Sequence, residues 1–170
     1  RIAFAIAPSA LGMVLAAETA RGVCAILLDH DADALVADLR KRFPAADIAP
    51  GGPTLDARIA GVVSLVENPE RVCDLPLDIR GTAFQMRVWS ALRQIAPGET
   101  AHYSEIADRI GAPGAARAVA GACAANPLAI AIPCHRVVGR NGALSGYRWG
   151  VDRKAALLDK ECAASKTRKS

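Results

Sequence analysis

The feature that most constrains the fold is a change in the spacing of apolar residues along the chain. In the first part, apolar runs are short and separated by Gly and small polar residues, at 2–7, 13–17 and 23–28. Runs of this length between turn residues predict three strands of an antiparallel sheet. After Thr82, apolar residues recur at helical spacing over longer stretches. The chain therefore predicts an α/β fold, with a small lobe of antiparallel sheet and helices followed by a mainly helical lobe.

Two helices are expected to follow the three strands. Asp31 or Asp33 can cap the first helix and Thr54 the second, because short polar side chains satisfy the free amides of a first turn. Between the helices, the Pro- and Gly-rich residues 49–53 predict a loop. Residues 75–79 predict a short strand or an extended linker. No side chain in this part suggests a functional site.

The second part opens with a capping box at Thr82 and Gln85, which predicts the start of a helix. Two short helices are expected at 104–110 and 114–124, and the Gly-containing turn between them is typical of a helix-turn-helix. A final helix is expected over about 149–163.

The charge of the chain is unevenly divided. Residues 1–80 carry 8 Lys or Arg against 11 Asp or Glu, whereas residues 81–170 carry 13 against 6. This asymmetry suggests a boundary near residue 80 and a polyanionic partner for the second lobe. The alternative is an ordinary solvated surface with no nucleic acid partner.

The five cysteines are odd in number and form no Cys-x-x-Cys pair. They therefore indicate neither a disulfide framework nor a zinc knuckle, and reduced thiols in the cytoplasm are the simpler interpretation. No apolar run approaches the roughly 18 residues that span a membrane, so no membrane partner is expected. The absence of an initiator Met suggests a processed chain or the later part of a longer one.

The expected helix at 114–124 consists mostly of Ala and Gly, with Arg117 as its one long polar side chain. A helix that reads bases needs several Arg, Asn or Gln side chains, which are absent here. Small side chains instead suit a close, shape-based contact, with Arg117 free to insert where a base has left the stack. The alternative is a buried packing helix.

Cys134 is followed directly by His135. A thiol attacks as its thiolate, and a histidine that takes the thiol proton would activate it. Neighbouring residues on a regular strand point to opposite faces, so a bend at Pro133 or a bridging water would be needed to connect them. The alternative is a buried structural cysteine.

The segment Ile132–Val137 resembles the signature of the O6-alkylguanine-DNA alkyltransferases, the methylated-DNA–protein-cysteine methyltransferases. Similar segments follow one another in the same order through residues 80–162. They are Phe84, Val88-Trp89, Pro97–Thr100, Tyr103-Ser104, Arg117–Val119, Ala125–Pro127 and Leu144–Gly150. Within the family, the first lobe and Leu144–Gly150 are most similar to the C-terminal alkyltransferase part of the bifunctional adaptive-response proteins.

The resemblance implies direct-reversal DNA repair. O6-alkylguanine, and O4-methylthymine as well, would be flipped out of double-stranded DNA, and the alkyl group would pass irreversibly to Cys134 in one turnover per molecule. It further implies a ribonuclease H-like lobe over 1–80 and a helix-turn-helix, DNA-binding and alkyl-acceptor domain over 81–170. We expect a bacterial, cytoplasmic monomer, associated with the nucleoid when bound to DNA, with no cofactor and no metal.

The resemblance also assigns roles to individual residues. His135 resembles the water-linked base for Cys134, and Glu161 the carboxylate that orients it. Asn126 resembles the residue that ties the helix-turn-helix to the cysteine segment. Tyr103 resembles the group that rotates the target phosphate and donates toward the guanine leaving group.

Arg117 resembles the finger that fills the gap left by the flipped base. The other expected DNA contacts are Tyr103, Ala115, Ala116, Gly121 and Arg136, and the expected pocket residues are Val137, Val138, Tyr147, Arg148 and Trp149. Two positions depart from relatives in the family. Gly114 stands where many relatives carry Lys, which removes a phosphate contact, and Trp149 stands where some relatives have Gly, which suggests a pocket poorer for bulky alkyl groups.

Three other functions remain open. A binder that flips alkylated bases without repairing them would share the fold, but binders of that type lack the cysteine. A helix-turn-helix transcription factor would need a polar recognition face. A thiol hydrolase would use Cys134, His135 and Glu161 as well, and turnover of an ester or amide would reveal it.

Overall fold

A computed structural model of the protein describes residues 1–144 and 146–169, the last three of them by backbone alone. The described chain divides into two compact units. Unit 1 comprises Arg1–Asn68, Val72–Ile79 and Pro127–Ala129, and unit 2 comprises Pro69–Arg71, Arg80–Asn126 and Ile130–Ser170. Short segments near residues 70 and 128 therefore belong to the opposite unit from their sequence neighbours.

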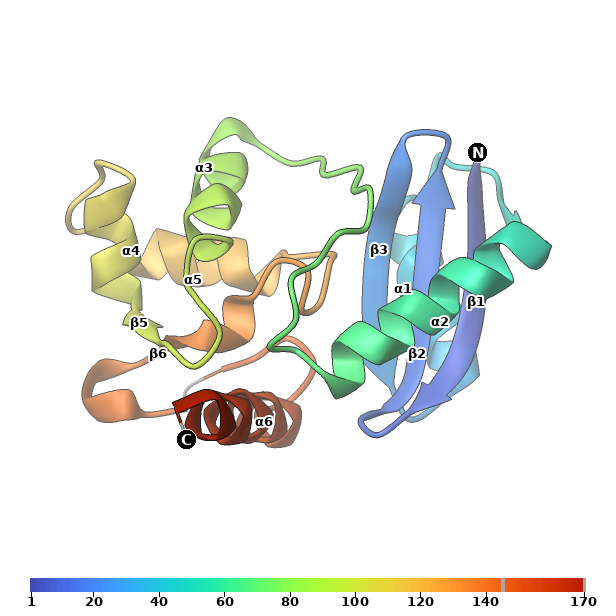
Figure 1. Ribbon diagram of the computed structural model, residues 1–170. Coiled ribbons are helices and arrows are strands. Elements are labelled where there is room, and N and C mark those ends of the chain that lie inside the picture. Colours follow the sequence, from blue (N-terminus) through green and yellow to red (C-terminus); the bar gives the residue numbers. More distant parts are fainter. Residues whose placement is uncertain (145, 170) are drawn as a thin grey trace. The chain divides into compact units, whose positions relative to one another are not determined.

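Unit 1 is built on a four-stranded sheet with the order β3-β2-β1-β4 (Figure 1). The strands are β1 (Ile2–Ser9), β2 (Gly12–Thr19), β3 (Gly22–Asp29) and β4 (Ile48–Pro50). The three predicted antiparallel strands are confirmed. The prediction of a loop over 49–53 is wrong at its start, because Ile48–Pro50 pairs in parallel with β1 through the Ile2–Ile48 register.

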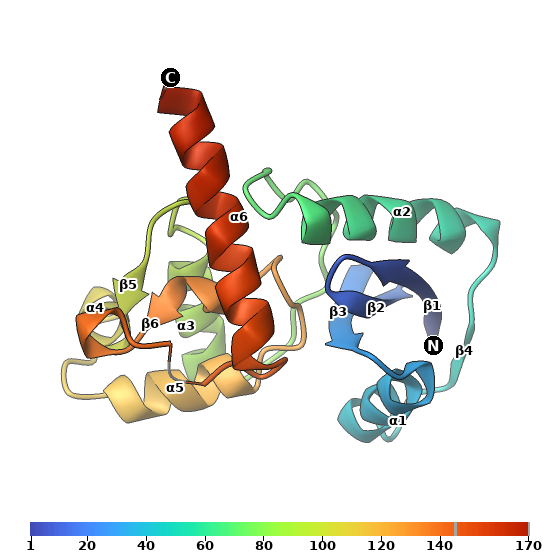
Figure 2. The ribbon, with the colours of Figure 1, turned by 90° about the horizontal axis from the view of Figure 1, so that it is seen from below.

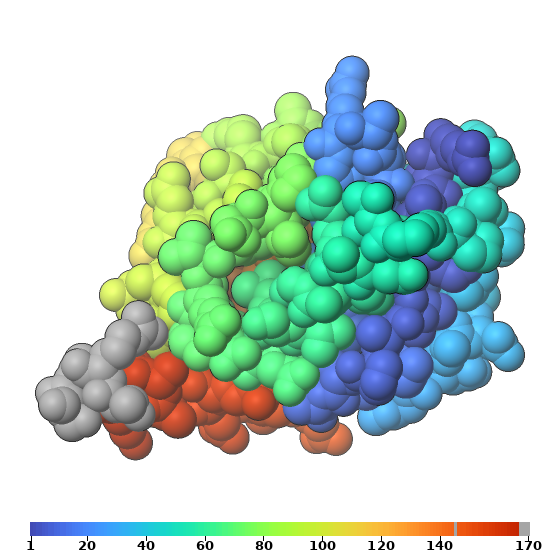
Figure 3. Space-filling model, turned by 45° about the vertical axis from the view of Figure 1, so that its right-hand side comes forward, coloured from blue at the N-terminus to red at the C-terminus, as the bar shows by residue number. Residues whose placement is uncertain are grey.

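Two helices cover the sheet of unit 1, α1 (Ala32–Arg42) and α2 (Pro53–Glu67). They lie on opposite faces, with α2 in front of the sheet in Figure 1 and both helices flanking it in Figure 2. Residues 14–17 and 23–28 are buried without alternation because both faces of these strands are covered. Figure 3 shows the outer face of α2, in teal, on the surface of unit 1.

The caps of these two helices differ from one another. The Asp31 side chain accepts a hydrogen bond from the Asp33 amide at 3.0 Å, which confirms the first predicted cap. The second prediction is wrong by two residues. Gly52 is the N-cap of α2 and Thr54 lies in the first turn, because Pro53 lacks an N–H and fits the first helical position.

Two extended segments add to the β3 side of the sheet in unit 1. Leu77 forms a β-bridge with Val23. The neighbouring Gly22 has φ 151°, and a Cβ on this residue would lie 2.6 Å from the carbonyl oxygen of Pro76. Farther along, the Ile26 amide donates to Pro127 O at 2.9 Å and the Ala129 amide donates to Ile26 O at 3.0 Å. The chain that leads toward Cys134 is therefore anchored to β3 just before it returns to unit 2.

Unit 2 is mainly helical (Figures 1 and 2). Its helices are α3 (Ala83–Leu92), α4 (Tyr103–Arg109), α5 (Ala116–Ala124) and α6 (Val151–Lys169), and its strands are β5 (Ala101–His102) and β6 (Val137–Val138), which pair in parallel. The capping box at Thr82 and Gln85 is confirmed, with reciprocal hydrogen bonds of 3.1 and 3.0 Å. The final helix begins at Val151 and extends beyond the predicted end at 163.

The core of unit 2 joins α3 to α5. Val88, Trp89 and Leu92 are buried on α3, and the Trp89 indole N–H donates to the carbonyl oxygen of Ala122 on α5 at 2.9 Å. Consecutive helices α4 and α5 also contact each other, so α5 has two helical neighbours that fix its position. Among the described helices, none has the length and apolarity needed to cross a bilayer.

Candidate alkyl-acceptor site

The site is centred on a short 3-10 helix, η1 (Cys134–Arg136), rather than on a strand. Pro133 precedes it and accepts a hydrogen bond from the Arg136 amide at 3.0 Å. In a 3-10 helix, successive side chains diverge by about 120°, so Cys134 and His135 leave the turn in different directions. All three residues of η1 are buried.

Asn126 ties the end of α5 to this turn. Its Nδ2 donates to the carbonyl oxygen of Ile132 at 2.9 Å and to Sγ of Cys134 at 3.1 Å. Asn126 is completely buried, so both hydrogen bonds form away from solvent. The amide therefore fixes the position of the sulfur and presents a donor to the charge that a thiolate would carry.

A second group of side chains connects η1 to α6. His135 Nε2 lies 2.8 Å from Oε2 of Glu161, and both side chains are fully buried. The Arg136 guanidinium binds the same carboxylate, with Nε 3.0 Å from Oε1 and Nη2 2.8 Å from Oε2. His135 Nδ1 is buried and has no hydrogen-bond partner among the residues that the structure describes. This nitrogen could therefore accept a proton.

The electrostatics of these groups favour a neutral thiol beside a neutral imidazole. Burial raises the pKa of Cys134 to about 11, although the Asn126 hydrogen bond and the charge of Lys154 oppose this rise. Burial also lowers the pKa of His135 despite its contact with Glu161. For Glu161, burial acts to raise the pKa, but hydrogen bonds from His135 and Arg136 outweigh it and lower the pKa. The carboxylate is thus ionised at neutral pH.

Lys154 is a buried residue of the site that the sequence analysis missed. Its side chain is 0% exposed, and its Nζ donates to the carbonyl oxygen of Gly146 at 3.1 Å. Burial lowers the pKa of this lysine, whereas Cys134 and Cys123 favour its charged form. Helical spacing could have identified it, because Lys154 precedes Glu161 by seven residues and so shares its face of α6.

A pocket of about 500 Å³ opens beside Cys134. Its lining residues are Tyr103, Ala120, Cys123, Ala124, Cys134, Gly146, Tyr147 and Arg148. Three of the predicted site residues, Tyr103, Tyr147 and Arg148, therefore lie together with Cys134 around one cavity. Cys123 was not predicted, although its spacing of three residues from Ala120 places both on one face of α5.

The other predicted pocket residues lie outside this lining. Val137 and Val138 form β6 and are buried against β5. Trp149 is 5% exposed, and its ring meets the edge of Tyr147 with centroids 5.4 Å apart at 70°. Trp149 therefore contacts Tyr147 of the pocket wall without lining the pocket itself. Ser145, within the motif that resembles the family, lies outside the described residues.

The expectation that Arg136 contacts DNA is contradicted by its position. The side chain is buried, and besides Glu161 its guanidinium binds the carbonyl oxygens of Ile95 at 2.7 Å and Pro69 at 3.1 Å. Every nitrogen of the group donates to an internal acceptor, so none is directed to an outside phosphate.

The outer face of α5 carries the remaining predicted contacts. Arg117 and Gly121 are exposed, while Ala115 and Ala116 are partly buried. A Cβ at Gly121 would meet no atom within 4 Å. Internal packing therefore does not require a small residue at this position. The buried-helix alternative holds only for the opposite face of α5, where Val119 is fully buried.

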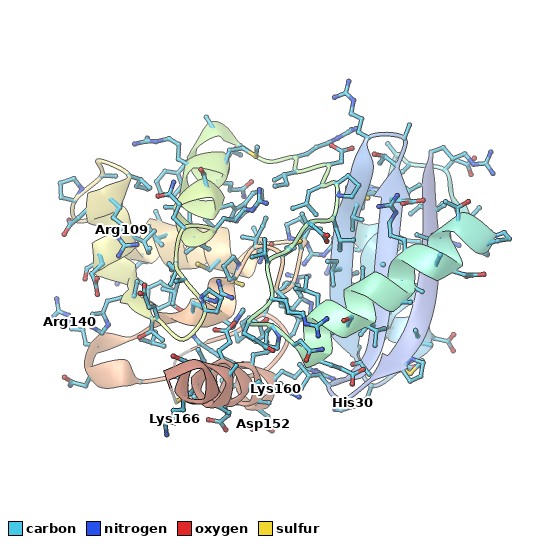
Figure 4. All side chains as sticks on the ribbon, viewed as in Figure 1. His30, Arg109, Arg140, Asp152, Lys160 and Lys166 are labelled. Carbon is cyan, nitrogen blue, oxygen red and sulfur yellow. The ribbon has the colours of Figure 1, made fainter. Side chains whose placement is uncertain are left out.

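Further cationic side chains lie on the surface of unit 2. Arg109, at the end of α4, and Arg140, in the short 3-10 helix η2 (Arg140–Gly142), are both exposed and are labelled in Figure 4. Arg148 is exposed as well, and it donates to the carbonyl oxygen of Ala124 at 3.0 Å. No group of three or more potential metal ligands occurs within the described part of the chain.

Comparisons with known proteins bear on this geometry. The family model described as 6-O-methylguanine DNA methyltransferase, DNA binding domain, matches residues 83–163. The bifunctional transcriptional activator/DNA repair enzyme Ada of Escherichia coli is 53% identical over 160 residues, which are 94% of this chain and 45% of that protein. The chain thus spans about half the length of that relative.

A second relative is matched over most of its length. The inducible methylated-DNA–protein-cysteine methyltransferase of Bacillus subtilis is 43% identical over 126 residues, 74% of this chain and 70% of the relative. Among solved structures, O6-methylguanine methyltransferase of Mycobacterium tuberculosis aligns with a TM-score of 0.77 and 36% identity, covering 96% of this chain and 94% of that one. A structure of Mycobacterium tuberculosis OGT in complex with DNA aligns with a TM-score of 0.77 and 37% identity, covering 94% and 92%. The chain belongs to the O6-methylguanine-DNA methyltransferase family.

Proposed function

We propose that the protein repairs O6-alkylguanine in double-stranded DNA by transferring the alkyl group to Cys134. The observation that carries this proposal is the placement of Cys134 in the wall of a pocket, with its sulfur held by Asn126. The names of its relatives support the same chemistry. Because the chain covers less than half of Ada, the proposal does not extend to transcriptional activation.

The buried pair of His135 and Glu161 would supply the base for this reaction. Glu161 is ionised and accepts a hydrogen bond from His135 Nε2, which leaves Nδ1 without a proton and able to accept one. A water between Nδ1 and Sγ would link the two groups, since Nδ1 has no hydrogen-bond partner among the residues that the structure describes. Activation of the Cys134 thiol would occur in the complex with DNA, because burial keeps this thiol protonated in the free protein.

In the transfer step, Sγ bonds to the alkyl carbon as the carbon–O6 bond breaks, and the bonding pair stays on guanine. The thiol proton passes to His135, and Tyr103 donates a proton to the departing base. Proton exchange through solvent then restores both side chains. The product is a thioether, so we propose one turnover per molecule, and we extend the substrate class to O4-methylthymine.

The DNA contact would be made by the outer face of α5, in a helix-turn-helix formed with α4. The open space around Gly121 would permit close approach of a groove, and exposed Arg117 would enter the gap left by the flipped base. Tyr103 would contact the target phosphate, because it begins α4 and lines the pocket. We propose a monomer acting in the bacterial cytoplasm at the nucleoid, as part of an adaptive response to alkylation.

Intact mass spectrometry tests the reaction. The protein is incubated with duplex DNA that carries one O6-methylguanine, alongside the variants Cys134→Ala and Cys162→Ala. We expect a gain of one methyl group on the peptide that holds Cys134. The gain should be retained in Cys162→Ala, since Cys162 is exposed and lies outside the pocket, and lost in Cys134→Ala.

Two other results would contradict the proposal. Tight binding to the damaged duplex without any gain of mass would indicate a base-flipping sensor. Repeated turnover of an ester or amide by the unmodified protein would indicate a thiol hydrolase that uses the same three side chains.

A further inference from the structure

Arg136 makes an unusually complete set of internal contacts for a cation. Its Nε and Nη2 bind the two oxygens of Glu161, while Nη1 and Nη2 bind the carbonyl oxygens of Ile95 and Pro69. The side chain is 6% exposed. The guanidinium is therefore held in one orientation against one carboxylate.

This pairing determines how charge is shared among three buried groups. Glu161 carries one negative charge and faces two possible cations, Arg136 and His135. A buried carboxylate strongly favours one nearby positive charge. Arg136 supplies that charge permanently, because a guanidinium does not lose its proton in proteins. His135 is then free to remain neutral, with its Nε2 proton donated to Glu161.

We propose that Arg136 is a positioning residue that neutralises Glu161 and thereby keeps His135 neutral and able to accept the Cys134 proton. The proposal rests on the proposed alkyl transfer to Cys134. Without Arg136, His135 would be the remaining cationic partner of Glu161. It would hold a proton as imidazolium, and Nδ1 would no longer be an acceptor.

Burial is the largest cause that lowers the pKa of His135, and charged neighbours act beside it. From α6, Glu161 stabilises the imidazolium and the cation of Lys154 opposes it. From its own turn, Arg136 also opposes the imidazolium. Helix α3 packs against η1 as well, but its one ionisable side chain, Arg87, is exposed and donates to Ile110 O.

The neighbouring groups of the pocket are neutral acids. Burial raises the pKa of both Cys134 and Tyr147, so neither supplies a negative charge at neutral pH. Glu161 is therefore the one anionic group among the groups that act on the pKa of His135 in the described structure. Arg136 is its direct cationic contact.

The first test needs no substitution. Nitrogen NMR of the histidine side chains in the wild-type protein reports the protonation of His135 directly. We expect the Nε2-protonated neutral form at pH 7, and a midpoint below the usual histidine value of about 6.5. An imidazolium at pH 7 would overturn the proposal, whatever the protein does with alkylated DNA.

Substitutions then separate charge from folding. In Arg136→Gln we expect the pKa of His135 to rise by about 1 to 3, as an adjacent carboxylate alone would produce. In Arg136→Lys, His135 should be neutral at pH 7, as in the wild type. Lysine keeps the positive charge but lacks the forked guanidinium that binds both carboxylate oxygens. The double variant Arg136→Gln with Glu161→Gln should also keep His135 neutral, because the uncompensated charge is gone.

The rate of methyl transfer in a single turnover provides the second measurement. Arg136→Gln should slow it about tenfold to hundredfold at pH 7, as the loss of a side chain that orients a metal ligand does in metalloenzymes. Raising the pH should recover part of the rate as the imidazolium loses its proton. The exposed Arg140 serves as control, and Arg140→Gln should leave the pKa of His135 unchanged.

The outcomes distinguish the two proposals. A slower rate in Arg136→Gln with no change in the pKa of His135 would give Arg136 a purely structural role and overturn the inference. A wild-type protein that shows the expected titrations but gains no methyl group would refute the proposed repair reaction alone. If Arg136→Gln does not fold, an imidazolium at pH 7 in the wild type or in Arg136→Lys would still overturn the inference.

Discussion

The side-chain amide of Asn126 lies 3.1 Å from the sulfur of Cys134 and, through the same nitrogen, 2.9 Å from the carbonyl oxygen of Ile132. One NH₂ group thus serves two functions with its two protons. It satisfies a carbonyl next to the turn, and it offers a donor to the sulfur. The position of Cys134 and the pKa of its thiol therefore depend on the same side chain.

Asn126→Ala should reduce both stability and rate. The carbonyl of Ile132 would lose its donor in a buried place, at a cost of about 1–3 kcal/mol in the free energy of unfolding. The pKa of Cys134 should rise further, because the hydrogen bond to its sulfur lowers it now. We expect methyl transfer to slow about tenfold to hundredfold, the equivalent of a lost hydrogen bond to a charged group.

Urea denaturation and single-turnover rates measure these two effects. Asn68→Ala is a matched control, because the Asn68 side chain donates to the carbonyl of Ser64 at 2.9 Å at the end of α2, in unit 1. It should change stability without changing the rate. An unchanged rate in Asn126→Ala would show that the bond to sulfur has no part in the reaction.

Acid should destabilise the protein through His135. Its pKa is lowered by burial, so the unfolded chain binds a proton more readily than the folded one. This contribution is fully present above the unfolded pKa of about 6.5 and is lost as pH falls toward the folded pKa. Glu161, whose pKa is also lowered, adds a further loss below about pH 4.3.

Denaturation midpoints between about pH 8 and pH 5 test this dependence, with His135→Gln as the comparison. The variant should have a lower stability at pH 8 but a flatter profile between pH 6.5 and pH 5. Parallel profiles for the two proteins would mean that His135 does not dominate the acid response.

Local sequence was enough to predict the elements that depend on neighbouring residues. The Asp31 cap and the Thr82–Gln85 capping box both formed as expected, because each is completed within three residues. Strands β4, β5 and β6 are two or three residues long and exist only through pairing with distant segments. No local pattern marks such strands, so they were missed.

The site shows the same division between local and distant contacts. The motif around Cys134 could be identified from sequence, but the depth of Arg136 could not, because its acceptors come from residues 69, 95 and 161. Ile130 was equally unpredictable. It has φ 68°, a conformation that a β-branched residue strongly disfavours, and its side chain is buried.

Alkali should destabilise the protein through its buried thiols. Burial raises the pKa of Cys134 to about 11 and that of Cys123 to about 12. A raised folded pKa gives stability that is complete below the unfolded value of about 8.5 and is lost as pH rises through the folded value. The stability of the wild type should therefore fall as pH rises above about 8.5.

Cys134→Ala and Cys123→Ala should each remove part of this alkaline loss, and the double variant most of it. Cys162→Ala should not, because Cys162 is exposed. Thermal unfolding across this range measures the effect. A loss that persists in the double variant would assign it to other groups.

Gly114→Lys should strengthen DNA binding while weakening the fold. The residue has φ 85°, which is unfavourable for a side chain and costs about 1–2 kcal/mol, but a Cβ there would meet no atom within 4 Å. An added phosphate contact should steepen the slope of log affinity against log salt by about 1.

Fluorescence titration with duplex DNA at several salt concentrations measures that slope. Gly114→Gln carries the same backbone strain without the charge, so it should lose stability and leave the slope unchanged. Equal slopes for Gly114→Lys and the wild type would place this turn away from the phosphates.

Trp149 should control which alkyl groups the pocket accepts. It is 5% exposed, and its ring supports Tyr147, which lines the pocket beside Cys134. Trp149→Ala should let Tyr147 move back and should raise the rate of benzyl transfer relative to methyl transfer. Loss of the buried ring should also cost about 3–5 kcal/mol in the free energy of unfolding.

The ratio of benzyl to methyl transfer rates is the decisive measurement, because it cancels any general loss of active protein. Trp149→Phe keeps most of the ring volume against Tyr147, so its ratio should stay close to that of the wild type. An unchanged ratio in Trp149→Ala would mean that the position of Tyr147 does not depend on this contact. The limit on alkyl size would then lie with residues that touch the pocket directly, of which Cys123 on α5 is the first to substitute.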